Sequence, residues 1–393
     1  MLDIPHRTLA LTASGSLSAV GQGQFMFVVP WMLLARGHSA PASALATAFV
    51  YLPLLAFAIP AGLVADRANP VRVLRLACVA MLAASALYPL AWVAGHDLFW
   101  LVFVAAAVAG AMRTFAEAAV LRGIADTTFE SGLLRAHAVR STVNQAAVFG
   151  GPFAGLLLYR VGDVEAVMLG ICALNLAAIA LLQLVPAIGA DRVALGARLP
   201  LSAGLASLRG NPRLRAIGWA SLVWNMFVGA AIGIMPGVLR KHVGMDELSA
   251  SATLVAGALL VAVLTIPVVR GGQRRVGPIT TFVLAVLVQG SALLALAVTN
   301  ADVAILASLA YAVFLLSNSS AAASLNGARA LEVDMAHQAL VSLTLISVGL
   351  VGFIVGIALA ATFLDLLGFG AVLALVGLGM AATAVSFRRP LVA

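Results

Sequence analysis

The sequence predicts an all-α integral membrane protein with twelve transmembrane helices, and three observations lead to this prediction. Of the 393 residues, 63% are hydrophobic and only 10% are charged, whereas soluble domains carry about 25% charged residues. The apolar residues gather in long runs, and a helix needs about 20 such residues to cross the hydrocarbon layer. The runs do not alternate polar and apolar residues as the strands of a membrane barrel do.

Twelve apolar runs follow one another along the chain, separated by short polar connections. The first six lie at residues 9–34, 44–63, 73–94, 98–121, 138–159 and 166–185. The second six lie at residues 217–238, 249–269, 279–298, 303–325, 340–364 and 369–385. The sequence therefore predicts a six-helix bundle over residues 1–186 and a second one over residues 216–393. A linker at 187–215, with a short interfacial helix, is expected to join them.

The positions of the arginines favour one orientation in the membrane, because short cytoplasmic connections are enriched in basic residues. Connections after the even-numbered runs hold most of them: Arg67, Arg72, Arg75, Arg122, Arg135, Arg140, Arg192, Arg198, Arg209, Arg213, Arg215, Arg270, Arg274, Arg275 and Arg329. The other connections hold only Arg36, Arg160, Arg240 and Lys241. Both termini are therefore expected in the cytoplasm. The segment 270–278 is interpreted as the loop of the second half that corresponds to 62–75.

Composition also argues against several functions. The net charge of +8 does not indicate a nucleic-acid-binding protein, because the arginines are spread over many connections. Cys78 and Cys172 lie in apolar runs and are expected to be buried thiols. No pair of histidines has metal-ligand spacing on one helix, and no glycine-lysine phosphate loop is present. We expect no metal, no cofactor and no enzymatic activity.

The turning segment between the second and third runs carries a family motif. Gly62 is followed by Asp66 and Arg67, placed just after the last turn of the second helix, and then by Arg72. This pattern resembles the loop between helices 2 and 3 of the major facilitator superfamily, although Asn69 stands where the family usually has glycine. The resemblance implies two six-helix halves with substrate bound between them. It also implies that the aspartate braces the halves and selects an access state; the alternative is a polar residue at the membrane boundary.

A second motif lies in the fifth run. Gly151, Pro152 and Gly155 are similar to the glycine-proline motif on helix five of antiporters in the superfamily, with Ala147 and Leu156 at two of the family's glycine positions. The resemblance implies a role in gating and favours export. The alternative is an ordinary packing kink, because proline bends a helix and glycine allows close packing.

Arg113 and Glu117 are ionisable residues within the fourth run, where such groups are rare and face a cavity or each other. Their spacing of four places them on one helix face. Our hypothesis is that Glu117 takes up and releases a proton during transport, while Arg113 tunes it or binds an anionic group of the substrate. A static ion pair is the alternative.

Polar and aromatic side chains at membrane depth are candidates for substrate binding, Arg113 and Glu117 among them; the others are Gln22, Phe25, Asn144, Gln145, Trp224, Asn225 and Asn318. Each could instead bond to a neighbouring helix. Many relatives have an acidic residue near Gln22, which this chain lacks. Together these residues are expected to form a polar cavity with Phe25 and Trp224 in its lining.

The resemblance covers most of the chain and points to the bacterial drug and siderophore exporter branch. It implies a monomeric inner-membrane transporter that exports small amphipathic or hydrophobic compounds by alternating access, in exchange for protons. Two alternatives stay open. One is a transporter for a specific metabolite, siderophore or lipid, and the other is a membrane sensor that transports nothing.

Overall fold

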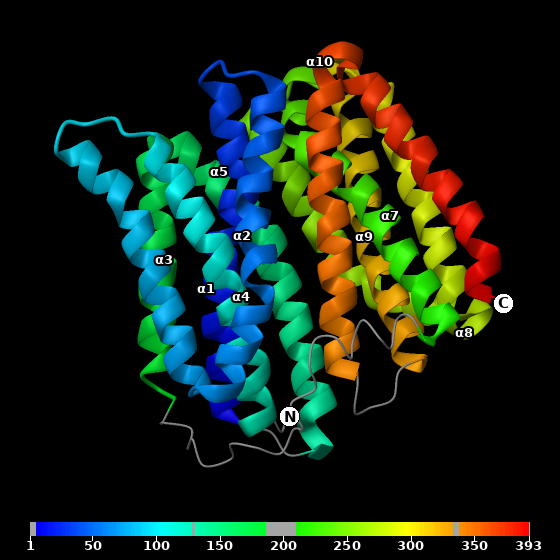
Figure 1. Ribbon diagram of the computed structural model, residues 1–393. Coiled ribbons are helices and arrows are strands. Elements are labelled where there is room, and N and C mark those ends of the chain that lie inside the picture. The colour runs from blue at the N-terminus through cyan, green and yellow to red at the C-terminus, as the bar shows by residue number, and fades with distance from the viewer. Residues whose placement is uncertain (1–4, 128–129, 186–209, 333–337, 393) are drawn as a thin grey trace. The chain divides into compact units, whose positions relative to one another are not determined.

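The computed structural model describes residues 5–127, 130–185, 210–332 and 338–392, and the regular structure in these ranges is helical (Figure 1). Its α-helices are α1 (His6–Ala35), α2 (Ala40–Arg67), α3 (Pro70–Val93), α4 (Trp100–Thr127), α5 (Glu130–Leu182), α7 (Pro212–Gly237), α8 (Glu247–Ala297), α9 (Ala304–Leu331) and α10 (Gln338–Val392). A π-helical turn, η2 (Val238–His242), continues α7, and a 3₁₀ turn, η3 (Ala301–Val303), precedes α9.

The three longest helices, α5, α8 and α10, are each interrupted once by non-helical backbone. The interruptions lie at Gly162 and Asp163, at Gly277, and at Gly368. Gly277 and Gly368 have φ values of 81° and 76°, which glycine adopts without a steric penalty. Asp163 has φ 54°, and its carboxylate accepts a hydrogen bond from the Val164 N–H at 2.8 Å. The nine helices thus comprise twelve helical segments, which confirms the predicted fold class.

The helices extend beyond the apolar runs, so several expected loops are shorter than predicted. Helix α2 continues through Arg67, and α3 begins at Pro70. Asp66 therefore lies in the last turn of α2 and not after it. The predicted loop at 270–278 was also wrong, because α8 runs through this segment and is interrupted only at Gly277. Hydropathy reports where a helix meets lipid, but arginine is a good helix former and lets the helix continue into the polar zone.

Helices α3 and α7 begin with the same N-capping sequence, an asparagine followed by proline. The Asn69 Oδ1 accepts hydrogen bonds from the N–H groups of Val71 and Arg72, at 2.9 and 3.3 Å. The Asn211 Oδ1 does the same for the first turn of α7. Proline at the first helical position lacks an N–H that would have no partner there. Asn69 therefore caps α3 at the position where glycine was expected from the family pattern.

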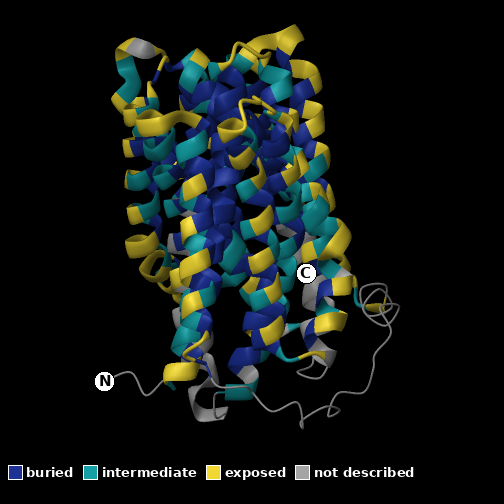
Figure 2. Ribbon diagram, turned by 90° about the vertical axis from the view of Figure 1, so that its left-hand side faces the viewer, coloured by how far each residue is buried: buried dark blue, intermediate teal, exposed yellow. Residues whose placement is uncertain are grey.

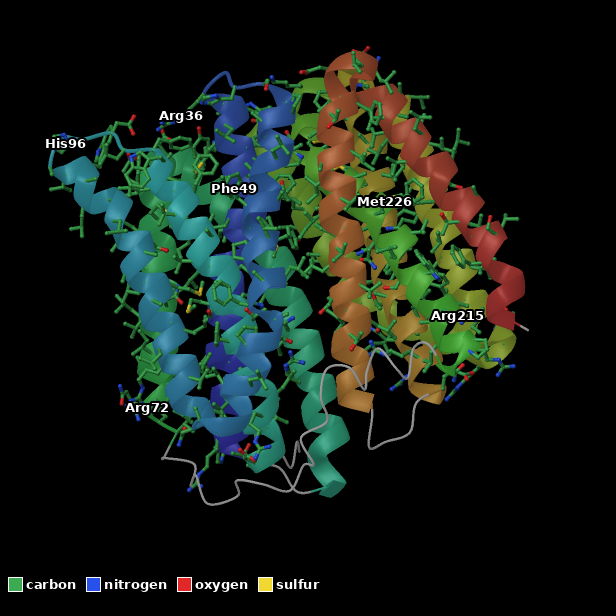
Figure 3. The ribbon with its side chains drawn as sticks, viewed as in Figure 1. Arg36, Phe49, Arg72, His96, Arg215 and Met226 are labelled. Carbon is green, nitrogen blue, oxygen red and sulfur yellow. The ribbon has the colours of Figure 1, made fainter. Side chains whose placement is uncertain are left out.

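The chain divides into two compact units. Among the described residues, unit 1 holds 5–32, 49–127 and 130–185, and unit 2 holds 33–48, 210–332 and 338–392. In unit 1, α3 packs against α4 and α5; in unit 2, α10 packs against α7 and α8, and α8 against α9. Arg72 lies in the first turn of α3 and His96 lies three residues beyond its end, so the two labels show the course of this helix through unit 1 (Figure 3). Of the predicted linker at 187–215, residues 187–209 lie outside the described residues, and α7 already begins at Pro212.

Figure 2 marks the exposed positions along the helices, and many of them carry large apolar side chains. Leu90 on α3, Leu309 on α9 and Leu366 on α10 are each more than half exposed. Nine described helices are long and apolar enough to cross a membrane. Exposed apolar surface on this scale marks a face that meets another apolar phase. Lipid therefore solvates these faces, and the polar groups gather inside each unit.

Candidate functional site

Arg113 and Glu117 form an ion pair on one face of α4, inside unit 1. The Arg113 Nη2 lies 2.9 Å from the Glu117 Oε2 and donates to the Asn144 Oδ1 on α5 at 2.5 Å. Arg113 is only 9% exposed. A guanidinium at this burial depends on its partners, because an uncompensated buried charge is strongly destabilising.

A second arginine reaches the same carboxylate from α5. Arg140 was predicted to lie in a cytoplasmic connection, but α5 begins at Glu130 and already contains it. Its side chain is 14% exposed and forms an ion pair with the Glu117 Oε1. Arg113, Glu117, Arg140 and Asn144 together are called the Arg113 cluster. Two guanidiniums and one carboxylate give this cluster a formal charge of +1.

Helix α1 closes one side of the Arg113 cluster. Thr12, Gly15 and Ser16 line a small cavity of about 10 Å³ with the cluster residues, which is room for about one water molecule. Gly15 allows the close approach, because a Cβ there would lie 2.6 Å from the Val120 Cγ2. The Glu117 side chain is 35% exposed. This side chain is therefore only partly buried, in contrast to that of Arg113.

Unit 2 contains a neutral counterpart, the Gln289 cluster of Trp224, Gln289 and Asn318. The Trp224 indole N–H donates to the Gln289 Oε1 at 2.9 Å. The Gln289 Nε2 donates to the Asn318 Oδ1 at 3.1 Å. The Trp224 ring also makes an edge-to-face contact with Phe282, with centroids 5.8 Å apart. The structure thus brings together two predicted site residues through a third, Gln289, that sequence reasoning missed.

Both missed residues had a weak signal in the sequence. Gln289 is the one glutamine in its apolar run and is fully buried; a lone amide in such a run needs a partner on another helix. Arg140 follows the start of a predicted run by only two residues. The positive charge of Arg140 was interpreted as a sign of a cytoplasmic connection, so its ion pair with Glu117 on α4 was not predicted.

Of the other predicted substrate-binding residues, the three whose side chains are described belong to neither cluster. The Asn225 Nδ2 donates to the backbone carbonyl of Ser221 at 2.8 Å, within α7. Gln22 is buried in α1, and its Nε2 has no hydrogen-bond partner among the described residues. Phe25 is buried in unit 1 and Trp224 in unit 2, so a cavity that they share stays a prediction. The Gln145 side chain lies outside the described residues.

Residues 11–342 match the Major Facilitator Superfamily. The chain belongs to this family. No individual curated protein sequence matches it. The fold is similar to that of a mutant of the nucleoside transporter NupG, with a TM-score of 0.76 at 13% identity over 98% of this chain and 100% of that one.

Two further solved transporter structures have a similar fold. One is a bacterial homologue of the human lysosomal transporter Spinster, with a TM-score of 0.65, 15% identity, and coverage of 98% of this chain and 94% of that one. The other is the human organic anion transporter MFSD10, with a TM-score of 0.65, 16% identity, and coverage of 98% and 100%. At these identities the likeness concerns the fold, and the chain is a multi-pass transporter of the Major Facilitator Superfamily.

The superfamily's helix-five motif lies where α5 crosses α1 in unit 1. A Cβ on Gly151 would lie 2.8 Å from the Gly23 Cα and 3.0 Å from the Gln24 N. A Cβ on Gly155 would meet the side chains of Val28 and Gln24. Pro152 lies between these glycines, inside α5. Gly151 therefore lets the backbones of α5 and α1 approach closely, as small residues do in membrane helices, and Gly155 leaves room for two side chains of α1.

The segment at the end of α2 that resembles a superfamily motif differs from the one in α5, because its glycine is not packed against another helix. A Cβ on Gly62 would meet nothing within 4 Å, so packing within the structure does not require glycine there. Arg72 is exposed in the first turn of α3. The side chains of Asp66 and Arg67 lie outside the described residues, and their bracing role stays a prediction.

Proposed function

We propose that this transporter exports small amphipathic or hydrophobic compounds in exchange for protons, by alternating access. We place it as a monomer in the bacterial inner membrane, with both termini in the cytoplasm, in the drug and siderophore exporter branch. The Arg113 cluster is the observation that supports the proposal most directly. Ionisable side chains at the depth of spanning helices are costly and mark ligand or ion pathways.

Glu117 is the group to which we assign the proton. When it is ionised, its carboxylate joins Arg113 on α4 to Arg140 on α5. A proton on the carboxylate removes its charge and weakens both ion pairs, so α4 is released from α5. Ion pairs that are made in one state and broken in another are a known way to switch between conformations.

We assign the gating of this exchange to the two family motifs. Gly151, Pro152 and Gly155 lie where α5 crosses α1, on the same helix that carries Arg140 and Asn144. Gly62, Asp66, Arg67 and Arg72 lie where α2 turns into α3, and their part in gating rests on the family pattern.

Vesicles containing the full-length protein and an imposed proton gradient test the proposal. Accumulation of a chemically varied panel of labelled dyes and drugs is compared for wild type, Glu117→Gln and Asp126→Asn. Asp126 is the matched control, because it also lies on α4 and pairs with an arginine four residues away, Arg122, at 3.2 Å. Glutamine resembles the protonated carboxyl and cannot release a proton, so we expect Glu117→Gln to lose gradient-driven accumulation and Asp126→Asn to keep it. Full accumulation by Glu117→Gln would show that the proton binds elsewhere.

A second candidate is a transporter for one specific metabolite, and the charge of +1 on the Arg113 cluster favours an anionic one. A carboxylate or phosphate group can bind to two guanidiniums with paired hydrogen bonds. A proton on Glu117 would free both arginines for that anion, so proton and substrate would bind together. Proton exchange requires the reverse, since proton and substrate then compete. Binding measured over a pH series separates the candidates: an anion binds more tightly as pH falls, and an exchanged compound more weakly.

A further inference from the structure

A wide cavity of about 790 Å³ lies at the start of α7 in unit 2. Its lining is basic and aromatic: Asn211, Pro212, Arg213, Arg215, Ala216 and Trp219, with Phe387 from α10. Trp219 is 55% exposed. Arg213 pairs with Glu332 at 3.3 Å, whereas Arg215 is exposed and forms no ion pair with a described residue. Arginine beside an exposed tryptophan is the composition typical of the membrane–water interface.

A second cavity, of about 240 Å³, lies between α7 and both segments of α10. Its lining is wholly apolar and includes Met226 and Ala230 from α7, Leu359 and Phe363 from the first segment of α10, and Val376 from the second. Leu359 and Phe363 are 44% and 47% exposed, so this crevice opens on the lipid-facing surface of unit 2. It offers room for a hydrocarbon chain and no hydrogen-bonding group.

The two cavities are aligned along the same two helices. On α7, Arg215, Trp219 and Met226 are spaced by four and seven residues, which places them on one helix face. Figure 3 shows Arg215 near the start of α7 and Met226 further along the same helix. Trp219 and Met226 are thus about 10 Å apart along the axis. On α10, Val376 and Phe387 are eleven residues apart, close to three full turns. On α7 the two cavities therefore share one helix face, with the basic and aromatic cavity nearer the start of the helix.

We propose that the two cavities form one binding site for an anionic phospholipid of the surrounding membrane. The headgroup phosphate binds at Arg215 with Arg213 beside it, Trp219 lies at the level of the glycerol backbone, and an acyl chain fills the crevice along α7 and α10. A basic pocket between spanning helices attracts anionic headgroups, with about 1 kcal/mol for each basic residue near the surface. Lipid binding at this site requires neither the proton nor the transported compound.

Fluorescence quenching of Trp219 tests the site in the full-length protein, held in zwitterionic nanodiscs. Phosphatidylglycerol or phosphatidylcholine with brominated acyl chains is added in increasing fractions. The Trp219 signal is the difference between wild type and Trp219→Phe, which removes the contribution of the four other tryptophans. We expect half-quenching at about fivefold less phosphatidylglycerol than phosphatidylcholine, the ratio that 1 kcal/mol corresponds to.

Three variants make the result specific. Arg215→Gln should abolish the preference for phosphatidylglycerol, and Arg215→Lys should keep most of it. Arg275→Gln is the matched control, because Arg275 is also an exposed arginine of unit 2, on α8. This variant should keep the full preference for phosphatidylglycerol.

Equal quenching by the two lipids in wild type would overturn the proposal. So would an equal loss in Arg215→Gln and Arg275→Gln, which would indicate general surface charge. Absence of quenching by either lipid would also overturn it, because no acyl chain would then lie near Trp219.

Discussion

The polar centre of unit 1 is charged, whereas the polar centre of unit 2 is neutral. In unit 1 a single carboxylate on α4 holds two arginines from two helices. In unit 2 an indole and two amides form a chain of hydrogen bonds through the fully buried Gln289. Both arrangements join neighbouring helices inside an apolar surround. They differ in what a single proton can do to them.

The difference separates a network that can switch from one that cannot. Amide and indole groups do not change charge between the pH values that a cell offers, so the Gln289 cluster keeps its bonds. The Arg113 cluster balances costly charges, and removal of one of them changes the energy of the others. We therefore assign proton coupling to unit 1 and a purely structural role to the Gln289 cluster of unit 2. Four sets of substitutions test this contrast.

The largest effect is expected for Glu117→Ala. This change leaves the guanidiniums of Arg113 and Arg140 facing each other without a counter-charge. Breaking a buried ion pair costs about 3–5 kcal/mol, and we expect the lower end because Glu117 is 35% exposed. Thermal unfolding of the purified protein should show a fall of several degrees relative to wild type. An unchanged unfolding temperature would mean that the two arginines are solvated.

A smaller loss is expected for Gly151→Val in α5, because the side chain would enter the backbone of α1. Overpacking of this kind costs about 1–3 kcal/mol. Gly62→Ala is the paired change in α2, where a Cβ meets open space, and its unfolding temperature should equal that of wild type. If Gly62→Ala nevertheless lost transport, the glycine would be needed in another access state.

The next loss of stability is expected for a change in the Gln289 cluster. Gln289→Leu leaves the Trp224 N–H and the Asn318 carbonyl without their partner, at a cost of about 1–3 kcal/mol for a buried unsatisfied group. The loss should be independent of pH, because no group in the cluster titrates. Unfolding temperatures of Gln289→Leu and wild type, measured over a pH series, should therefore run in parallel. If the two unfolding temperatures converged at one end of the pH series, the Gln289 cluster would contain a group that titrates, and its role would not be purely structural.

The smallest effects are expected at the two helix starts. Asn69→Ala in unit 1 and Asn211→Ala in unit 2 each remove a side chain that caps two N–H groups. Loss of such a cap costs about 1 kcal/mol. The two variants should be destabilised equally, since the device is the same in both units. A clear difference in unfolding temperature would show that one of the asparagines has a further role.

The clusters show how far sequence reasoning reached into the site. The pairing of Arg113 with Glu117 followed from their spacing of four, because neighbours on one helix face need no knowledge of the fold. Asn144 was a predicted candidate, but its bond to Arg113 was not foreseen. Arg140 was assigned to a loop, and Gln289 was passed over. Hydropathy measures how apolar a segment is and says nothing about which face it turns to a neighbour.

The sequence by itself determined the twelve helical segments, because a chain in lipid must satisfy its backbone hydrogen bonds within each apolar run. It also determined the family, through motifs that are local in the chain. Only the tertiary structure decided that Glu117 holds two arginines, that Gln289 joins Trp224 to Asn318, and that two cavities align along α7 and α10. These contacts depend on the rotation and depth of each helix against its neighbours. That rotation is set by packing between segments far apart in the chain.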